Sequence, residues 1–99
     1  MAMYLEIITP DKSIYKGEVD YVNLPGADGS FGVLKDHAPI ISTLKEGEIV
    51  FLQTEGGDYE FDSESGEIKH ATGNDKELSY TVKGGVVEVK DNKISVLAE

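Results

Sequence analysis

The sequence predicts an all-β fold, an antiparallel sandwich or barrel, in a single domain that spans residues 1–99. Three observations lead to this prediction. Short runs rich in β-branched and aromatic residues alternate between apolar and polar side chains. Turn-forming clusters of glycine, proline, asparagine and aspartate separate these runs at intervals of about 8–12 residues, as is typical of antiparallel β proteins. The only helical candidate, KDHAPIISTL, has Pro39 in its middle, where proline breaks a helix.

The N-terminal third is expected to contain the strands YLEIIT and EVDYVNL, separated by the turn cluster TPDKS. Successive side chains of a strand point to opposite faces of the sheet. In the second strand this alternation places Val19 and Tyr21 on one face, and Val22 and Leu24 on the other.

The middle of the chain is expected to contain the strands EIVFLQT and ELSYTV, which are rich in residues that favour strands. Between them, residues 55–78 form the most polar and acidic part of the sequence. We predict that this part is a solvent-exposed extra hairpin, with DYEFD paired against EIKHA, and that it lies outside the core.

The C-terminal stretch VVEVKDNKISV predicts a hairpin, because Asp91 and Asn92 both tolerate the left-handed conformations of a two-residue turn. Such a turn sets Lys90 opposite Lys93, and the strands then pair outward from it. The apolar residues that share one face in this register are Val87, Val89, Ile94 and Val96.

The composition excludes several classes of function. The net charge is −10, from 19 acidic and 9 basic residues, which argues against binding nucleic acid or anionic lipid, since both depend on Lys and Arg. It suits a partner with a basic surface. No cysteine is present, so disulfides and thiolate metal sites are excluded. The sequence has no signal-peptide pattern and no apolar run long enough to span a membrane, so we expect no direct insertion into lipid.

His37 follows Asp36 and lies near Ser42, so these residues are candidates for a hydrolytic triad. Adjacent residues in an extended chain point to opposite faces, so Asp36 cannot orient His37 through this adjacency. No GxSxG motif is present to supply an activated serine. We therefore predict no catalytic residue, and we read His37 as a turn residue that bonds locally or faces a partner.

Metal and phosphate sites are also not expected. The two histidines lie on distant strands, and the calcium-loop candidate DYEFDSESGEIK has Ser63 where glycine is needed and Lys69 where glutamate is needed. GADGSFG has spaced glycines but no following GK[ST] motif. We expect no metal or cofactor, and we assign Gly26, Gly29 and Gly32 to a tight turn and a strand bulge.

The stretch GSFGVLKDHAPIISTLKEGEI resembles the epsilon subunit of F-type ATP synthases, which is called delta in mitochondria. The opening MYLEIITPDKSIYKGEVDYVNLPGADG and the closing VKGGVVEVKDNKISVLAE are similar to the two ends of the family's N-terminal domain. The resemblance covers nearly the whole chain apart from residues 55–78. Its motifs stand in the family's order, and their residues are Tyr15, Gly17, Gly29, Gly32, His37, Ala38, Pro39, Ile40, Ile41, Leu44, Lys45, Glu46 and Gly47.

This resemblance implies a flattened β-sandwich of about ten strands and a non-catalytic role in the central stalk. In the family this domain binds the gamma subunit, rests on the c-ring and couples ion translocation to rotation and ATP synthesis. The implied location is peripheral, on the cytoplasmic face of the bacterial plasma membrane.

The resemblance also implies which residues contact each partner. The contacts to the c-ring would be Gly26, Ala27, Asp28, Gly29, Ser30, Phe31 and Gly32. The contacts to gamma would be His37, Ala38, Pro39, Ile40 and Ser42. Many family members carry glutamate at the position where this chain has Ser30. Asp28 is therefore the acidic residue that this loop offers to the basic loops of the c-ring.

Most family members continue beyond this domain into a C-terminal helical hairpin that inhibits ATP hydrolysis and in some bacteria binds ATP. The chain ends at Glu99, where those helices would begin, so we expect neither inhibition by that route nor nucleotide binding. Two alternatives stay open from the residues alone. One is a stand-alone ligand-binding β-sandwich that uses residues 55–78, and the other is a small hydrolase centred on His37.

Overall fold

The computed structural model describes residues 3–61, 67–71 and 74–99. These residues form strands, turns and loops, and none of them belongs to a helix long and apolar enough to cross a membrane. Ten strands lie within the described residues: β1 (Met3–Ile8), β2 (Ser13–Gly26), β3 (Gly29–Val33), β4 (Ile40–Leu44), β5 (Gly47–Gln53), β6 (Tyr59–Phe61), β7 (Ile68–Ala71), β8 (Asn74–Val82), β9 (Gly85–Lys90) and β10 (Lys93–Ala98).

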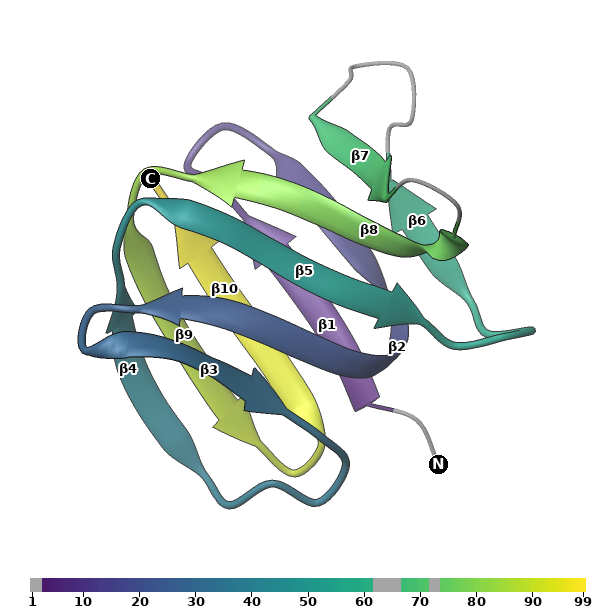
Figure 1. The fold of residues 1–99 in the computed structure, drawn as a ribbon, viewed down its shortest axis with the longest axis horizontal. Coiled ribbons are helices and arrows are strands. Elements are labelled where there is room, and N and C mark those ends of the chain that lie inside the picture. Colours follow the sequence, from purple (N-terminus) through teal and green to yellow (C-terminus); the bar gives the residue numbers. More distant parts are fainter. Residues whose placement is uncertain (1–2, 62–66, 72–73) are drawn as a thin grey trace.

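The strands form two layers packed face to face (Figure 1). One layer contains β1, β10, β9 and β4, paired in this order, and the other contains β3, β5, β8 and β7. β2 belongs to both layers, because its first half pairs with β1 and its second half pairs with β5 and β3. The predicted all-β sandwich is therefore confirmed, and β2 is the strand that joins its two layers.

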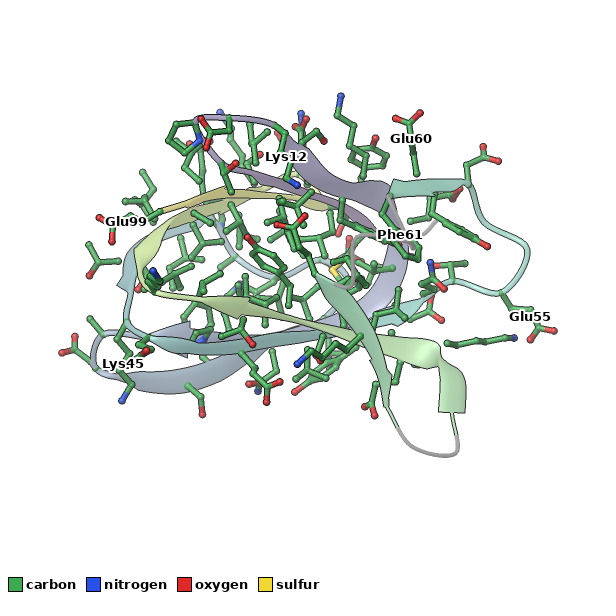
Figure 2. All side chains as sticks on the ribbon, turned by 90° about the horizontal axis from the view of Figure 1, so that it is seen from above. Lys12, Lys45, Glu55, Glu60, Phe61 and Glu99 are labelled. Carbon is green, nitrogen blue, oxygen red and sulfur yellow. The ribbon has the colours of Figure 1, made fainter. Side chains whose placement is uncertain are left out.

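The hydrophobic core lies between the layers, where apolar side chains leave water, and Figure 2 shows these side chains filling the space between the ribbons. The predicted C-terminal hairpin is confirmed, with Val89 opposite Ile94 and Val87 opposite Val96. The turn residues Asp91 and Asn92 have φ values of 52° and 62°. The buried apolar residues are Met3, Leu5, Ile7, Ile14, Tyr15, Val19, Val22, Leu24, Val33, Leu44, Ile49, Phe51, Ile68, Leu78, Tyr80, Val82, Val87, Val89, Ile94, Val96 and Ala98.

The alternation expected in β2 was wrong because the strand contains a bulge. The pairing register with β5 shifts between Val19 and Tyr21. The extra residue changes which side chains face inward, so Val19, Val22 and Leu24 are all buried and Tyr21 is half-buried. The bulge lies where β2 passes from one layer to the other.

One strand pair departs from the predicted antiparallel arrangement. β1 and β10 run parallel, from Tyr4 opposite Lys93 to Ile8 opposite Leu97. These strands come from the two ends of the chain and are not joined by a turn, so no hairpin fixes their relative direction. The other strand pairs of the described residues are antiparallel.

The strand pairing expected within residues 55–78 was wrong. β6, from the DYEFD segment, pairs with β2, and β7, from the EIKHA segment, pairs with β8. Phe61 packs against the core, with its ring centre 5.6 Å from that of Tyr15, and Ile68 is only 6% exposed. Each segment therefore extends the sandwich instead of pairing with the other, and residues 62–66 and 72–73 lie outside the described part.

Candidate functional site

The turn between β2 and β3 holds the first set of predicted contact residues, 26–32. Gly26 pairs with Gly29 across the turn, and Ala27 and Asp28 form its tip. The tip residues and Ser30 are exposed. The turn is fixed to β4, because the backbone N–H of Ala27 donates to the carbonyl O of Thr43 at 3.0 Å.

The three glycines of this turn are required for different physical reasons. Gly29 has φ of 133°, a conformation that L side chains rarely adopt. At Gly26 a Cβ would lie 2.7 Å from the carbonyl O of Gly29, and at Gly32 it would lie 2.8 Å from the hydroxyl O of Tyr21. Close packing therefore excludes side chains at Gly26 and Gly32, whereas backbone conformation excludes them at Gly29.

Phe31 does not extend into solvent from the tip of the turn. It is half-buried and packs against the core, and its ring lies beside Gly26. The surface that this turn presents to a partner is therefore mostly backbone, together with the carboxylate of Asp28 and the hydroxyl of Ser30.

The second predicted set, residues 37–42, begins in the loop between β3 and β4. His37 is half-buried, and its ring Nδ1 lies 2.7 Å from the carbonyl O of Ala38, to which it donates. Its backbone N–H donates to the carbonyl O of Leu34 at 3.2 Å. The carboxylate of Asp36 is instead bonded by the side chain of Asn92. This geometry gives His37 a backbone partner in place of the carboxylate that a hydrolytic triad needs.

Two adjacent isoleucines at the beginning of β4 differ in their exposure to solvent. Ile40 is half-buried and packs against the core, whereas Ile41 is 72% exposed. Ser42 is half-buried, and its hydroxyl donates to the carbonyl O of Thr43 at 3.1 Å. The resemblance selected Ile40 as a contact, but the large apolar side chain free to meet a partner on β4 is that of Ile41.

Ile41 belongs to an apolar area on the outer face of β4, β9 and β10. Val86 and Leu97 are directly opposite each other on that face and are 40% and 59% exposed. Ile41 pairs with Glu88, two residues along from Val86, so it lies diagonally beside Val86. This area was not among the predicted contacts, although the predicted hairpin register, which turns Val87 inward, already turns Val86 outward.

The β2–β3 turn and the loop that leads into β4 lie near opposite ends of this strand (Figure 1). The β2–β3 turn is bonded to Thr43 near the end of β4, and residues 37–39 lead into its start at Ile40. Thr43 is three residues from Ile40, so at about 3.3 Å per strand residue the bonded end of the turn is on the order of 10 Å from the start of β4. Ser42, the last residue of the second segment, directly precedes Thr43, so the two segments meet along β4.

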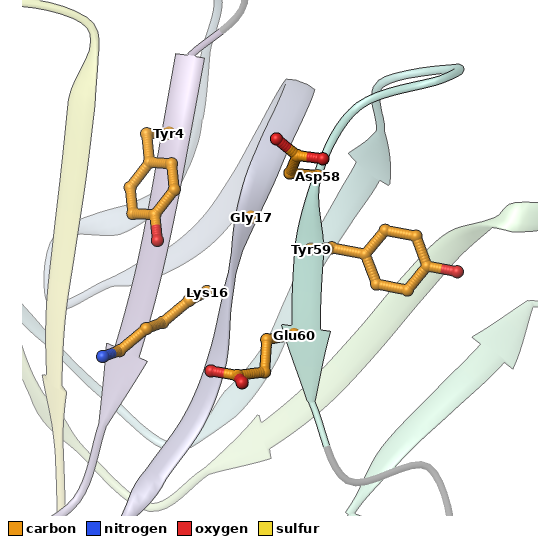
Figure 3. Close-up of a pocket in the computed structure, with 6 residues that line it drawn as sticks. All are labelled: Tyr4, Lys16, Gly17, Asp58, Tyr59 and Glu60. Atoms are coloured by element: carbon orange, nitrogen blue, oxygen red, sulfur yellow. The ribbon is translucent and has the colours of Figure 1, made fainter.

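A third surface feature is a groove between β1, β2 and β6, with a volume of about 170 Å³ (Figure 3). Gly17 allows β6 to lie close, since a Cβ there would be 2.5 Å from Cβ of Tyr59. The Tyr59 ring turns away from Lys16 (Figure 3), and the Lys16 ammonium lies 3.7 Å from a carboxylate oxygen of Glu6. The groove is smaller than the roughly 300–1,000 Å³ typical of ligand sites. Its lining residues are Tyr4, Lys16, Gly17, Asp58, Tyr59 and Glu60.

A second hollow, of about 420 Å³, lies over β9 and β10 and is lined by charged and polar residues. Ligand sites are mostly apolar with a few polar groups, so this lining does not favour a small-molecule site. Its lining residues are Glu88, Lys90, Asp91, Lys93 and Ser95.

The pKa shifts do not create an acid or base that works near neutral pH. Burial raises the pKa of Tyr15 above 10.0, although the hydrogen bond that Gln53 donates to its hydroxyl at 3.3 Å opposes this. Burial also raises the pKa of Tyr80. The hydrogen bond from Lys76, at 2.8 Å, lowers the pKa of Glu55 below 4.5. All three shifts move away from neutrality, where general acid–base catalysis is most effective.

Within the described part of the chain, no three His, Cys, Asp or Glu residues come together in a way that could hold a metal ion. The described surfaces include two candidate contact segments, 26–32 and 37–42, and the apolar area around Ile41, Val86 and Leu97.

Comparison with known proteins agrees with this reading. Residues 2–63 match the family model described as the ATP synthase delta/epsilon chain, beta-sandwich domain. The ATP synthase epsilon chain of Nitratidesulfovibrio vulgaris strain DP4 is 38% identical over 98 residues, which are 99% of this chain and 58% of that protein. The epsilon chain of Leptospira borgpetersenii is 36% identical over 95 residues, which are 96% of this chain and 59% of that protein. The chain thus spans a little over half the length of these relatives.

Solved structures share the fold. A chain of the Euglena gracilis mitochondrial ATP synthase, in a structure of OSCP, F1 and the c-ring, aligns with a TM-score of 0.72 at 19% identity, covering 98% of this chain and 50% of that one. A chain from the central stalk and c-ring of the Tetrahymena thermophila mitochondrial ATP synthase aligns with a TM-score of 0.60 at 15% identity, covering 99% of this chain and 63% of that one. At these identities the likeness concerns the fold alone.

Proposed function

Because the chain belongs to the family of the β-sandwich domain of the ATP synthase delta/epsilon chain, we propose that it is a non-catalytic rotor component of an F-type ATP synthase. In this role one of its surfaces binds the gamma subunit and another rests on the c-ring. The domain then couples ion translocation to rotation and ATP synthesis, peripherally on the cytoplasmic face of a bacterial plasma membrane.

The observation that carries this proposal is the extent of the family match. Residues 2–63 include both candidate segments, 26–32 and 37–42, together with the strands that support them. The two solved neighbours come from structures of ATP synthase assemblies that contain a c-ring. The match therefore supports both the fold and its use as an assembly component.

The geometry supports contact with two partners at once. The β2–β3 turn lies near the end of β4, and residues 37–39 lead into its start. The turn is bonded to β4 through Ala27, and the loop before β4 is bonded to the β9–β10 turn through Asp36. A coupling that transmits torque must not deform under load. A two-layer sandwich meets this need because its strands are cross-linked by backbone hydrogen bonds and its core is closely packed.

The proposal is tested by capture of purified gamma subunit on the immobilised chain. Ile41→Asp places a charge in the exposed apolar area, and His37→Glu changes the loop that leads into β4. We expect each variant to raise the Kd for gamma by about tenfold, since burying an unpaired charge at an interface costs more than 1 kcal/mol. Tyr59→Asp is the matched control, because Tyr59 is 58% exposed and lies on β6, away from both segments.

Failure of the unaltered chain to capture gamma would contradict the proposed function. If the chain captures gamma but Ile41→Asp and His37→Glu bind as tightly as Tyr59→Asp, the gamma surface lies elsewhere on the sandwich.

A further inference from the structure

The loop that leads into the proposed gamma surface is held by a residue 56 positions away in the sequence. The backbone N–H of Asp36 donates to Oδ1 of Asn92 at 2.7 Å. The side-chain amide of Asn92 donates back to Oδ1 of Asp36 at 3.1 Å. In Figure 1 the β3–β4 loop passes beside the β9–β10 turn, where Asn92 is located. The two residues thus satisfy each other's polar groups through a reciprocal pair.

The loop has little else to fix its conformation. No residue from Leu34 to Pro39 is buried, and Leu34 itself is 60% exposed. The other hydrogen bonds described for these residues, from His37 to Leu34 and to Ala38, stay within the loop. Apolar burial therefore contributes little here, and the link to Asn92 is the described contact that ties the loop to a distant part of the fold.

Asp36 also adopts a conformation that needs support. Its φ is 64°, in the left-handed region that is unfavourable for a non-glycine residue, although aspartate tolerates it better than most. This conformation sets the direction in which the chain enters His37. Asn92 accepts a hydrogen bond from the backbone N–H of Asp36 and donates one to its carboxylate, so the pair stabilises this conformation directly.

Asn92 is itself held rigidly. It has φ of 62° in the two-residue turn of the β9–β10 hairpin, and its carbonyl O accepts a hydrogen bond from the N–H of Tyr4 at 2.9 Å. It is half-buried, whereas Asp91 beside it is exposed. The side chain of Asn92 thus projects from a fixed backbone that joins β1, β9 and β10.

We propose that Asn92 is a positioning residue, whose side-chain amide holds residues 34–39 in the conformation that presents His37–Ser42 to the partner. The hydrogen bonds described above support the claim that Asn92 orders the loop. The claim that this ordering favours binding of gamma rests on the proposed function. Without Asn92 the loop must be ordered at the moment of binding, and that entropic cost weakens the complex.

The test compares two glycine variants of the same turn. Asn92→Gly removes the amide but keeps a residue that readily adopts positive φ, so the hairpin is retained. Asp91→Gly makes the same kind of change at the neighbouring turn position, whose φ of 52° is equally suited to glycine. We expect Asn92→Gly to speed hydrogen exchange of the Asp36 amide by about tenfold or more, and to raise the Kd for gamma about tenfold. Asp91→Gly should change neither.

Exchanging the two residues distinguishes a lost hydrogen-bonded pair from a general loss of stability, because only the former is restored by the exchange. Asn92→Asp alone sets two carboxylates against each other and should reproduce the defect. Adding Asp36→Asn restores a donor opposite an acceptor, so slow exchange at position 36 and tight binding should both return.

Unchanged exchange at Asp36 in Asn92→Gly would overturn the proposal, as would faster exchange with undiminished affinity for gamma. If even the unaltered chain fails to bind gamma, the proposed function falls, and the exchange measurement still decides whether Asn92 orders the loop.

Discussion

Three glycines in the β2–β3 turn illustrate how one residue type meets different local demands. The backbone at Gly29 has φ of 133°, and no other atom lies within 4 Å of where its Cβ would be. At Gly32 the backbone is ordinary and the obstacle is the ring of Tyr21. The sequence alone does not distinguish the two glycines, and the structure shows that backbone strain acts at Gly29 and crowding at Gly32.

A double-mutant cycle should show this difference. Gly29→Ala should lower the free energy of unfolding by about 1–2 kcal/mol whatever residue stands at position 21, because its cost is backbone strain. Gly32→Ala should cost about 1 kcal/mol with Tyr21 present and much less after Tyr21→Ala, which removes the ring. Urea denaturation measures all four effects. Equal coupling of both glycines to Tyr21 would contradict this assignment.

Among the elements, β6 and β7 show that the acidic segment, residues 55–78, contributes strands to the sandwich. Its polar composition suggested an appendage, yet each strand joins a different neighbour, β2 and β8 respectively. Alternation explains how a short strand from this polar segment contributes to a core, since Ile68 faces inward while Lys69 faces solvent. A single inward residue is too weak a signal to detect in a polar sequence.

Ile68→Ala should therefore lower the free energy of unfolding by about 2–3 kcal/mol, because it removes buried methyl groups and leaves a cavity. Lys69→Ala is the control on the same strand and should stay within about 0.5 kcal/mol of the unaltered chain, since its side chain is exposed. The measurement is the urea unfolding midpoint at fixed m-value. A change below about 0.5 kcal/mol for Ile68→Ala would return β7 to the status of an appendage.

At the scale of the whole molecule, the net charge of −10 favours approach to a basic partner. Exposed Asp28 lies at the tip of the turn proposed to meet the c-ring. Long-range attraction between charges raises the rate of encounter, and salt screens it over a Debye length of about 10 Å at 0.1 M.

The association rate with solubilised c-ring should accordingly fall by about tenfold as NaCl rises from roughly 50 to 500 mM, while the dissociation rate changes less. Asp28→Asn should flatten this salt dependence. Glu60→Gln removes the same charge from exposed β6, on the other side of the molecule from Lys45 beside the turn (Figure 2), and should have a smaller effect. If both variants show the same salt dependence of the association rate, Asp28 does not contact the c-ring.

The all-β class and the C-terminal hairpin with its register were predictable from the sequence, because they follow from side-chain alternation and from turn residues a few positions apart. Motifs also sufficed to suggest the family, since they are short and stand in a fixed order. The tertiary structure decided the bulge at Val19–Tyr21, the parallel pairing of β1 with β10, the separate partners of β6 and β7, and the link between Asp36 and Asn92. Each of these joins segments that are distant in sequence or depends on closing one layer over the other. Such contacts are selected by the packing of the whole core, and no local pattern encodes them.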